Sequence, residues 1–181
     1  MTTRAEAKLT VPVGERDHIQ GPTEAPVTLV EYGDYECSYC GQAYFVVKEL
    51  QRLLGNRLRF VFRNFPLTTV HPYAQRAAEA AEAAGAQGKF WEMHDHLFEH
   101  QQELDDKHQK KYAAQLGLDL SRFNRDMSEH RYAARIREDL LSGVRCGVNG
   151  TPTFCINGVR YDGAPDLDSM VAAIEESVAS V

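Results

Sequence analysis

The sequence predicts an α/β protein in which a long helical segment interrupts a single sheet. Short β-branched and apolar runs at residues 25–32 and 58–63 indicate two strands with a helical pattern between them. Residues 72–146 then show helical periodicity and no strand pattern, and the Asn157-Gly158 pair between two apolar runs indicates a hairpin. We therefore expect a core of residues 1–68 and 147–181 with a helical subdomain of residues 69–146 inserted in it.

The first strand of this scheme is opened by Pro26 and closed by Gly33. In residues 37–54 apolar side chains recur at steps of three and four, which predicts a helix, and Gly55 with Asn56 supplies its stop. Strand, helix and strand with short links predict two parallel strands joined by a right-handed crossover. Among the first twenty residues, only residues 9–13 resemble a strand.

The helical segment is predicted to hold four or five helices. Its breaks fall at Gly85, at Asp105 and at residues 118–119. After it, apolar runs at residues 153–156 and 159–161 flank the Asn-Gly pair, which favours a type I′ turn. Residues 165–178 predict a closing helix with apolar side chains on one face.

The charge balance argues against some classes of partner. The 181 residues include 20 Lys and Arg against 26 Asp and Glu, a net charge of -6. Nucleic acids and anionic membrane surfaces attract basic proteins, so we expect neither as the main partner. No apolar run approaches the roughly 18 residues of a membrane span, so we expect no membrane insertion.

The start of the chain bears on its location. The first twenty residues lack the continuous apolar stretch of a secretory signal, which predicts a cytoplasmic protein. A chain trimmed of its signal would instead be periplasmic or extracytoplasmic. In a reducing cytosol, paired cysteines are more often catalytic or metal-binding than structural.

Cys37 and Cys40 are separated by Ser38 and Tyr39 at the start of the predicted helix. This spacing places the two sulfur atoms one turn apart, close enough to form a disulfide. Cys37 lies at the helix N-terminus, where the dipole and free N–H groups favour a thiolate, whereas Cys40 faces the core. An exposed attacking sulfur beside a shielded resolving sulfur is the arrangement that thiol–disulfide exchange requires.

The helix terminus alone lowers the expected pKa of Cys37 to roughly 7–8. The alternatives to redox chemistry are half of a zinc site or two inert core cysteines. Zinc needs a second ligand pair, and Cys146 and Cys155 do not repeat the spacing of two residues between cysteines. We therefore predict no metal and no organic cofactor.

Glu31 is unusual because it lies in a strand that is expected to be central, where a carboxylate is costly to bury. It precedes Cys37 by six residues, which predicts a proton-transfer role toward Cys40; the alternative is a solvated Glu31 beyond an early strand end. In Gly150-Thr151-Pro152-Thr153, a proline at the start of a strand after a turn is compatible with a cis bond, although ordinary base rates favour trans.

Two histidine patterns invite other interpretations. His96 and His100 share a helix face with Glu92, but without an H-E-x-x-H arrangement or a third ligand this pattern is typical of a solvated face. His71, before Pro72, either approaches the cysteines or has a capping or turn role.

Together these motifs resemble the thioredoxin superfamily and, within it, the DsbA-like proteins. The resemblance covers residues 21–174. It is carried by Glu31, Asp34-x-x-Cys37-x-x-Cys40, Asn64-Phe65-Pro66-Leu67, His71-Pro72, Lys89-Phe90-Trp91, His94, Leu97-Phe98, Gly147-Val148, Gly150-Thr151-Pro152-Thr153-Phe154 and Ile156-Asn157-Gly158.

The resemblance implies a thioredoxin fold with a helical subdomain inserted between the second and third core strands. It also implies that Pro152 is cis and lies against Cys37, and that Thr151 offers its backbone to an extended substrate segment. Tyr39, Thr151 and Pro152 are accordingly the expected substrate-binding residues. The substrates it implies are protein or peptide thiols and disulfides, or a low-molecular-weight thiol.

The sequence departs from this family at two places. Strongly oxidising periplasmic members carry Pro-His between the cysteines, whereas Ser38 and Tyr39 offer no group ionisable near neutral pH. The direction of exchange (oxidase, reductase or isomerase) therefore stays open. Without a secretory signal in its first twenty residues, the sequence resembles the cytoplasmic DsbA-like proteins and the similar domains fused to some sodium/proton antiporters. Cys155 replaces a large apolar residue, and Cys146 with Cys155 forms either two free thiols or a second disulfide.

Two other classes of function remain alternatives to a protein-disulfide oxidoreductase. A non-catalytic peptide-binding module would use the same groove without exchange. A thiol-dependent peroxide or small-thiol reductase would turn over without a protein substrate.

Overall fold

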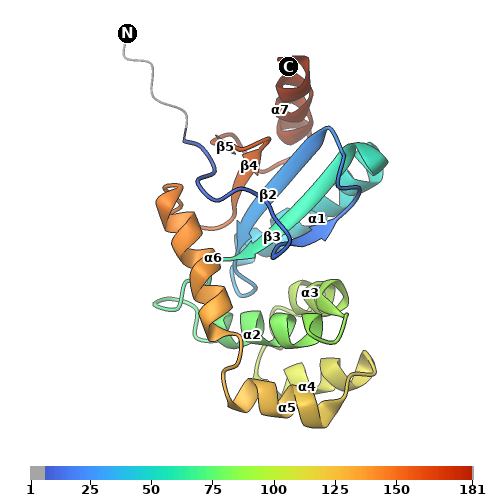
Figure 1. Cartoon of the computed structure of the whole chain (residues 1–181), viewed down its shortest axis with the longest axis vertical. Helices are drawn as coiled ribbons and strands as arrows, with labels where there is room; N and C mark the ends of the chain where they lie inside the picture. The colour runs from blue at the N-terminus through green and yellow to red at the C-terminus, as the bar shows by residue number, and fades with distance from the viewer. Residues whose placement is uncertain (1–6, 181) are drawn as a thin grey trace.

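The computed structural model describes residues 7–180, and in this part of the chain the strands form one five-stranded sheet in the order β1-β3-β2-β4-β5 (Figure 1). The strands are β1 (His18–Gln20), β2 (Val27–Gly33), β3 (Leu58–Asn64), β4 (Thr153–Ile156) and β5 (Val159–Tyr161). The helices are α1 (Ser38–Leu54), α2 (Ala74–Gly85), α3 (Phe90–Glu99), α4 (Asp106–Gln115), α5 (Leu120–Ser128), α6 (Ala133–Arg145) and α7 (Leu167–Ala179).

The centre of the sheet is β2, which is paired on both sides. It runs parallel to β3, with Glu31 opposite Phe62, and antiparallel to β4, with Glu31 opposite Phe154. Helix α1 connects β2 to β3, which confirms the predicted strand–helix–strand unit. Because β2 is paired on both edges, its C-terminal end has a fixed position, and α1 starts shortly after that end.

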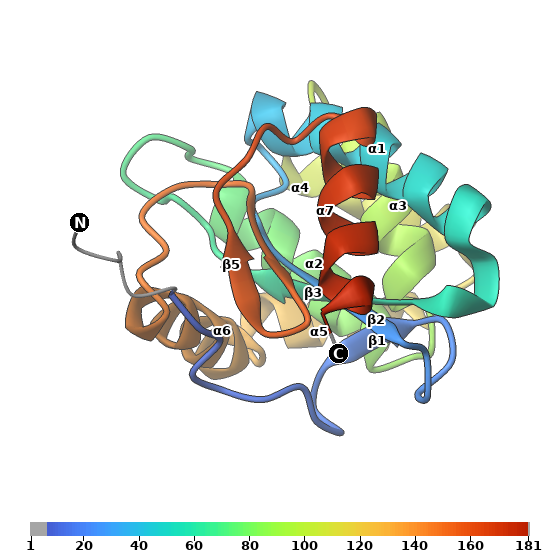
Figure 2. The ribbon, with the colours of Figure 1, turned by 90° about the horizontal axis from the view of Figure 1, so that it is seen from above.

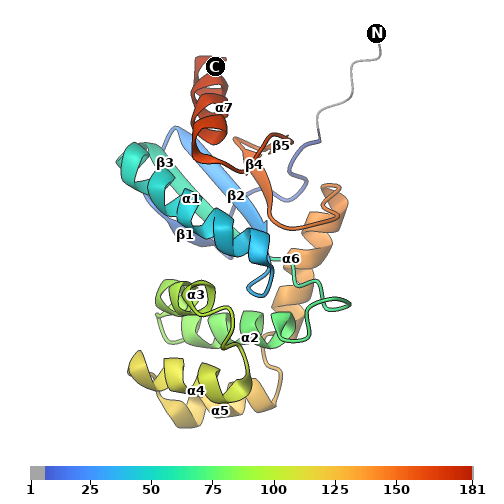
Figure 3. The same cartoon turned by 180° about the vertical axis from the view of Figure 1, so that it is seen from behind.

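The sheet separates two apolar layers. Helices α1 and α7 cover one face, as the views from above and from behind show (Figures 2 and 3). The larger core cluster lies here, with Leu29 and Leu50 fully buried. A smaller cluster on the opposite face contains Tyr32, Cys146 and Cys155. Helix α6 packs against β3, and α2 to α5 lie beyond the end of the sheet (Figure 1).

The helical segment between β3 and β4 agrees with the predicted pattern of four or five helices and no strand. Its breaks have local causes: the side chains of Asp105 and Asp119 accept hydrogen bonds from backbone N–H groups in the first turns of α4 and α5. The insertion follows the second predicted strand and precedes the third, as the fold class requires. No helix in the described residues has both the length and the apolar content needed to cross a bilayer.

The hairpin of β4 and β5 is confirmed in place and type. Asn157 and Gly158 have φ angles of 49° and 82°, the positive values that a type I′ turn needs at both central residues. The closing helix α7 follows and packs on α1 and β4.

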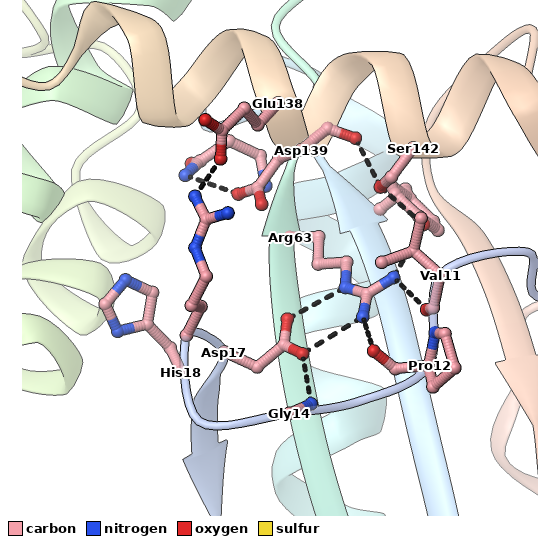
Figure 4. Close-up of polar contacts among 12 residues, drawn as sticks. Val11, Pro12, Gly14, Asp17, His18, Arg63, Glu138, Asp139 and Ser142 are labelled. Atoms are coloured by element: carbon pink, nitrogen blue, oxygen red, sulfur yellow. Dashed lines mark hydrogen bonds and ion pairs between the residues drawn. The ribbon is translucent and has the colours of Figure 1, made fainter.

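The expectation of a strand at residues 9–13 is wrong. The carbonyl groups of Val11 and Pro12 accept hydrogen bonds from the Arg63 guanidinium instead of entering the sheet (Figure 4). Arg63 also donates to both carboxylate oxygens of Asp17 and to the Tyr32 hydroxyl. The edge strand β1 follows this cluster and pairs antiparallel with β3.

Candidate active site

Cys37 is the N-cap residue of α1, so its carbonyl group begins the hydrogen-bonding pattern of the helix while its backbone is still extended. The carbonyl oxygen accepts from the Gly41 N–H at 3.0 Å. Only 5% of Cys37 is exposed, against 0% of Cys40. The prediction of an exposed attacking sulfur is therefore wrong, because the segment before β4 lies over Cys37, although the exposed fraction of Cys37 is still the larger of the two.

Cys37 and Cys40 are both free thiols in contact with each other. The Cys40 thiol, the Thr151 hydroxyl and two backbone N–H groups in α1 stabilise the Cys37 thiolate and lower its pKa to about 5, against the opposing effect of burial. The value of roughly 7–8 expected from the helix terminus is therefore wrong. Burial and the neighbouring Cys37 sulfur raise the pKa of Cys40 well above its ordinary value.

Thr151 and Pro152 form the other wall of the site. Their peptide bond is cis, as the resemblance implies, and the Cys37 thiol lies 3.6 Å from the carbonyl oxygen of Thr151. The Thr151 hydroxyl oxygen is buried and has no hydrogen-bond partner. It lies close enough to stabilise a thiolate on Cys37, so its unused donor is satisfied when that sulfur loses its proton.

Glu31 is buried in the middle of β2, so the alternative of a solvated residue beyond the strand end is wrong. Its Oε1 atom has no hydrogen-bond partner. Burial, together with the charge of Cys37, raises the pKa of Glu31 to about 8. A carboxyl group of this kind exchanges protons near neutral pH, which is the property that a proton-transfer role needs.

The remaining predicted residues fall in two places. Tyr39 lies on the first turn of α1 with 67% of its surface exposed, beside the reactive cysteine. Cys146 and Cys155 are buried in the smaller core cluster on the sheet face opposite α1. Both are free, and the sulfur of Cys146 accepts from the Thr10 N–H at 3.1 Å. The structure therefore does not bring this pair to Cys37.

Sequence reasoning missed Gln101, in the turn between α3 and α4. Its side-chain amide donates to the carbonyl oxygens of Tyr35 at 2.9 Å and Cys37 at 2.8 Å. A Cβ atom at Gly41 would come within 2.1 Å of the Gln101 Oε1 atom, so glycine is needed there for the contact. No local pattern marks a single glutamine in a turn as a partner of a cysteine so far away in the chain.

The histidine face of α3 offers no ligand set. His96 and His100 place their rings against Tyr112, at centroid distances of 5.2 and 5.5 Å. Within residues 7–180, no three His, Cys, Asp or Glu side chains are grouped as metal ligands would be.

Residues 14–176 match the family model described as Thioredoxin. The chain belongs to the thioredoxin superfamily. Solved structures that share its fold include DsbA proteins. A thioredoxin-like oxidoreductase from Silicibacter pomeroyi is 28% identical, with a TM-score of 0.80, and the match covers 91% of this chain and 93% of that one.

Two further structures show the same fold at lower identity. BdbD from Bacillus subtilis, in oxidised form, is 20% identical with a TM-score of 0.82, covering 96% of this chain and 97% of that one. Wolbachia pipientis α-DsbA1 is 20% identical with a TM-score of 0.81, covering 95% of each chain. The predicted fold class and the thioredoxin resemblance are thus confirmed.

The curated relatives of this thioredoxin-like chain are longer proteins. The Na(+)/H(+) antiporter NhaA 1 of Salinispora arenicola is 53% identical over 172 residues, which are 94% of this chain and 26% of that protein. The antiporter NhaA of Herminiimonas arsenicoxydans is 42% identical over 163 residues, again 26% of its length. The chain therefore spans about a quarter of the length of these relatives.

Proposed function

We propose that this protein is a thiol–disulfide oxidoreductase that exchanges disulfides with protein or peptide thiols through Cys37 and Cys40. The observation that carries the proposal is the opposite direction of the two thiol pKa values. The pKa of Cys37 is lowered to about 5, while that of its contact partner Cys40 is raised. Near neutral pH one sulfur is then a thiolate and the other a thiol, as attack and resolution require.

The proposed exchange needs only the two cysteines, Glu31 and the substrate. In the reductive direction, the Cys37 thiolate attacks a substrate disulfide, forms a mixed disulfide and releases one substrate thiolate. Cys40 then loses its proton to the Glu31 carboxylate, and its thiolate attacks Cys37, which forms the Cys37–Cys40 disulfide and releases the second substrate thiolate. The oxidative direction is the reverse, with Glu31 returning the proton to Cys40.

Substrate access is proposed to run along Thr151, Pro152 and the exposed ring of Tyr39. Thr151 is half-buried next to Cys37, and an extended peptide can pair with backbone beside the sulfur there. Three statements stay predictions: nucleic acid is not a partner, a low-molecular-weight thiol is a substrate, and the protein is cytoplasmic.

Trapping of mixed disulfides tests the exchange reaction. A Cys40→Ala variant cannot resolve a mixed disulfide on Cys37. It is expected to accumulate covalent complexes with a model protein that has been reduced and then reoxidised, whereas Cys37→Ala accumulates none. Cys146→Ala is the matched control, because it removes a buried thiol outside the site. Equal trapping by Cys37→Ala and Cys40→Ala would contradict the assigned roles. Turnover of a hydroperoxide without any protein thiol would favour the peroxide-reductase alternative.

A separate measurement tests the direction of exchange. Equilibration of the Cys37/Cys40 pair with glutathione gives its reduction potential. A stabilised thiolate favours the reduced form and makes the disulfide a stronger oxidant. With a pKa near 5 we expect a potential between that of thioredoxin, at about -270 mV, and that of DsbA, at about -120 mV.

A further inference from the structure

Asp34 follows β2 and is the residue from which the turn into α1 is built. Its side chain is completely buried, and both carboxyl oxygens accept hydrogen bonds. Oδ1 accepts from the Glu36 N–H at 2.8 Å, and Oδ2 accepts from the Leu67 N–H at 2.9 Å. Oδ2 also lies 2.8 Å from Nδ1 of His71. The Asp34 carboxyl group thus accepts from two backbone N–H groups and contacts one histidine ring nitrogen.

The backbone of Asp34 contacts both cysteines. Its carbonyl oxygen accepts from the Cys37 N–H at 3.2 Å, and its own N–H lies 3.5 Å from the Cys40 sulfur. The Asp34 side chain thus holds the turn whose backbone contacts both cysteines. A change in the hydrogen bonds of this carboxyl group therefore reaches both cysteines through the backbone of the same residue.

His71 is the partner that brings positive charge to this buried carboxylate. It comes from the loop between β3 and α2, and 24% of its side chain is exposed. The titratable groups that act on it are Asp34 and Glu36, from the turn before α1, and Cys37 at the start of α1. All three are acidic. Although burial opposes the effect, they raise the pKa of His71 above 6.5.

We propose that Asp34 and His71 form a positioning pair for the redox centre, in which protonated His71 neutralises the buried carboxylate and so keeps the surroundings of Cys37 favourable to a thiolate. When His71 loses its proton, one negative charge remains beside Cys37 and disfavours its ionisation. Linkage makes the effect reciprocal: the Cys37 thiolate favours protonated His71 to the same extent. The inference rests on the proposed function, because it concerns the reactivity of the same sulfur.

Two substitutions separate the charge of His71 from its hydrogen bond. His71→Gln keeps a donor for Asp34 and removes the charge, whereas His71→Lys keeps a positive charge across neutral pH. Alkylation of Cys37 by iodoacetamide, followed by mass spectrometry from pH 3.5 to 9, gives the pKa of this one cysteine. We expect His71→Gln to raise that pKa by roughly 0.5 to 1, and His71→Lys to restore it.

The matched control is His108→Gln. His108 also pairs with an aspartate, with Nδ1 2.7 Å from Asp105 Oδ2, and 27% of its side chain is exposed. This pair begins α4, outside the site, so its loss is expected to leave the Cys37 titration unchanged. A His71→Gln titration equal to that of the wild type would overturn the proposal, even if the melting temperature falls, and so would a failure of His71→Lys to restore the pKa.

The titration does not depend on exchange activity. If Cys40→Ala traps no mixed disulfide while His71→Gln still raises the pKa of Cys37, the proposed function fails and the positioning pair stands. If trapping succeeds and the pKa is unaffected, the positioning pair alone fails.

Discussion

The side-chain amide of Gln101 donates a hydrogen bond of 2.8 Å to the carbonyl oxygen of Cys37, 64 positions earlier in the chain. The same carbonyl group accepts from the Gly41 N–H, so it is shared between α1 and the turn after α3. The helical insertion therefore contacts the residue that carries the reactive sulfur, and the first turn of α1 is held from outside the thioredoxin core.

Replacing Gln101 by alanine removes the hydrogen bonds to Tyr35 and Cys37. We expect a loss of about 1–2 kcal/mol in the free energy of unfolding, which corresponds to about 2–8 °C in Tm for a domain of this size. Gln102→Ala, one position along in the same turn and exposed, is the control and is expected to have no effect. Equal melting temperatures for the two variants would show that the contact does not contribute to stability.

Glu31→Gln is expected to stabilise the protein at alkaline pH. The pKa of Glu31 rises from 4.5 to about 8 on folding, so folding opposes its ionisation. The cost is absent below pH 4.5, grows as pH rises from 4.5 to 8, and is then constant at about 2–5 kcal/mol. Removing the ionisable group abolishes this cost.

Denaturant unfolding of wild type and Glu31→Gln at pH 4 and pH 9 measures the difference. The two proteins should agree at pH 4 and diverge at pH 9. If Glu31 also transfers the Cys40 proton, resolution of a trapped mixed disulfide slows in the variant. A variant with the wild-type resolution rate at every pH would remove Glu31 from the mechanism.

Thr151→Val tests the buried hydroxyl beside the sulfurs. Valine keeps the shape and loses the donor that stabilises the thiolate, so the pKa of Cys37 should rise by about 1–2. The reduction potential should fall in parallel, by about 30 mV for each tenfold change in thiolate stability. Thr151→Ser retains the hydroxyl and should behave like the wild type. Unchanged titration in Thr151→Val would mean that another donor holds the charge.

Cys146 and Cys155 should behave as unreactive thiols. Burial, with the Cys146 sulfur nearby, raises the pKa of Cys155 to about 11, which suppresses its thiolate at neutral pH. In a Cys37→Ser, Cys40→Ser background without reductant, two thiols should titrate after unfolding and react slowly before it. Finding none after unfolding would demonstrate a disulfide between them.

The parts of the fold that could be predicted from sequence have local signals. The periodicity of α1, the aspartates that cap α4 and α5, and the Asn157-Gly158 turn each fix a structure within a few residues. Strand β1 has only three residues, with a histidine and a glutamine among them, so it carries no such pattern. Arg63 directs residues 11 and 12 away from the sheet, and that contact joins segments about fifty positions apart.

The site shows the same limit. The positions of Cys37 and Cys40 on one helical turn follow from their spacing, and the burial of Glu31 follows from its strand. The pKa of Cys37 depends also on Thr151, and its backbone contact depends on Gln101, neither of which is near it in sequence. The helix dipole therefore accounts for only part of the acidity of this thiol.

Thr151 follows Cys37 by 114 residues, so the ribosome synthesises both cysteines well before it synthesises Thr151. At about 5–20 residues per second, both cysteines leave the ribosome on the order of ten seconds before the loop that covers them. During that interval the nascent chain carries ordinary accessible thiols, open to any small oxidant nearby. Translation of the segment that contains Thr151 and Pro152 thus converts two unprotected sulfurs into a selective pair.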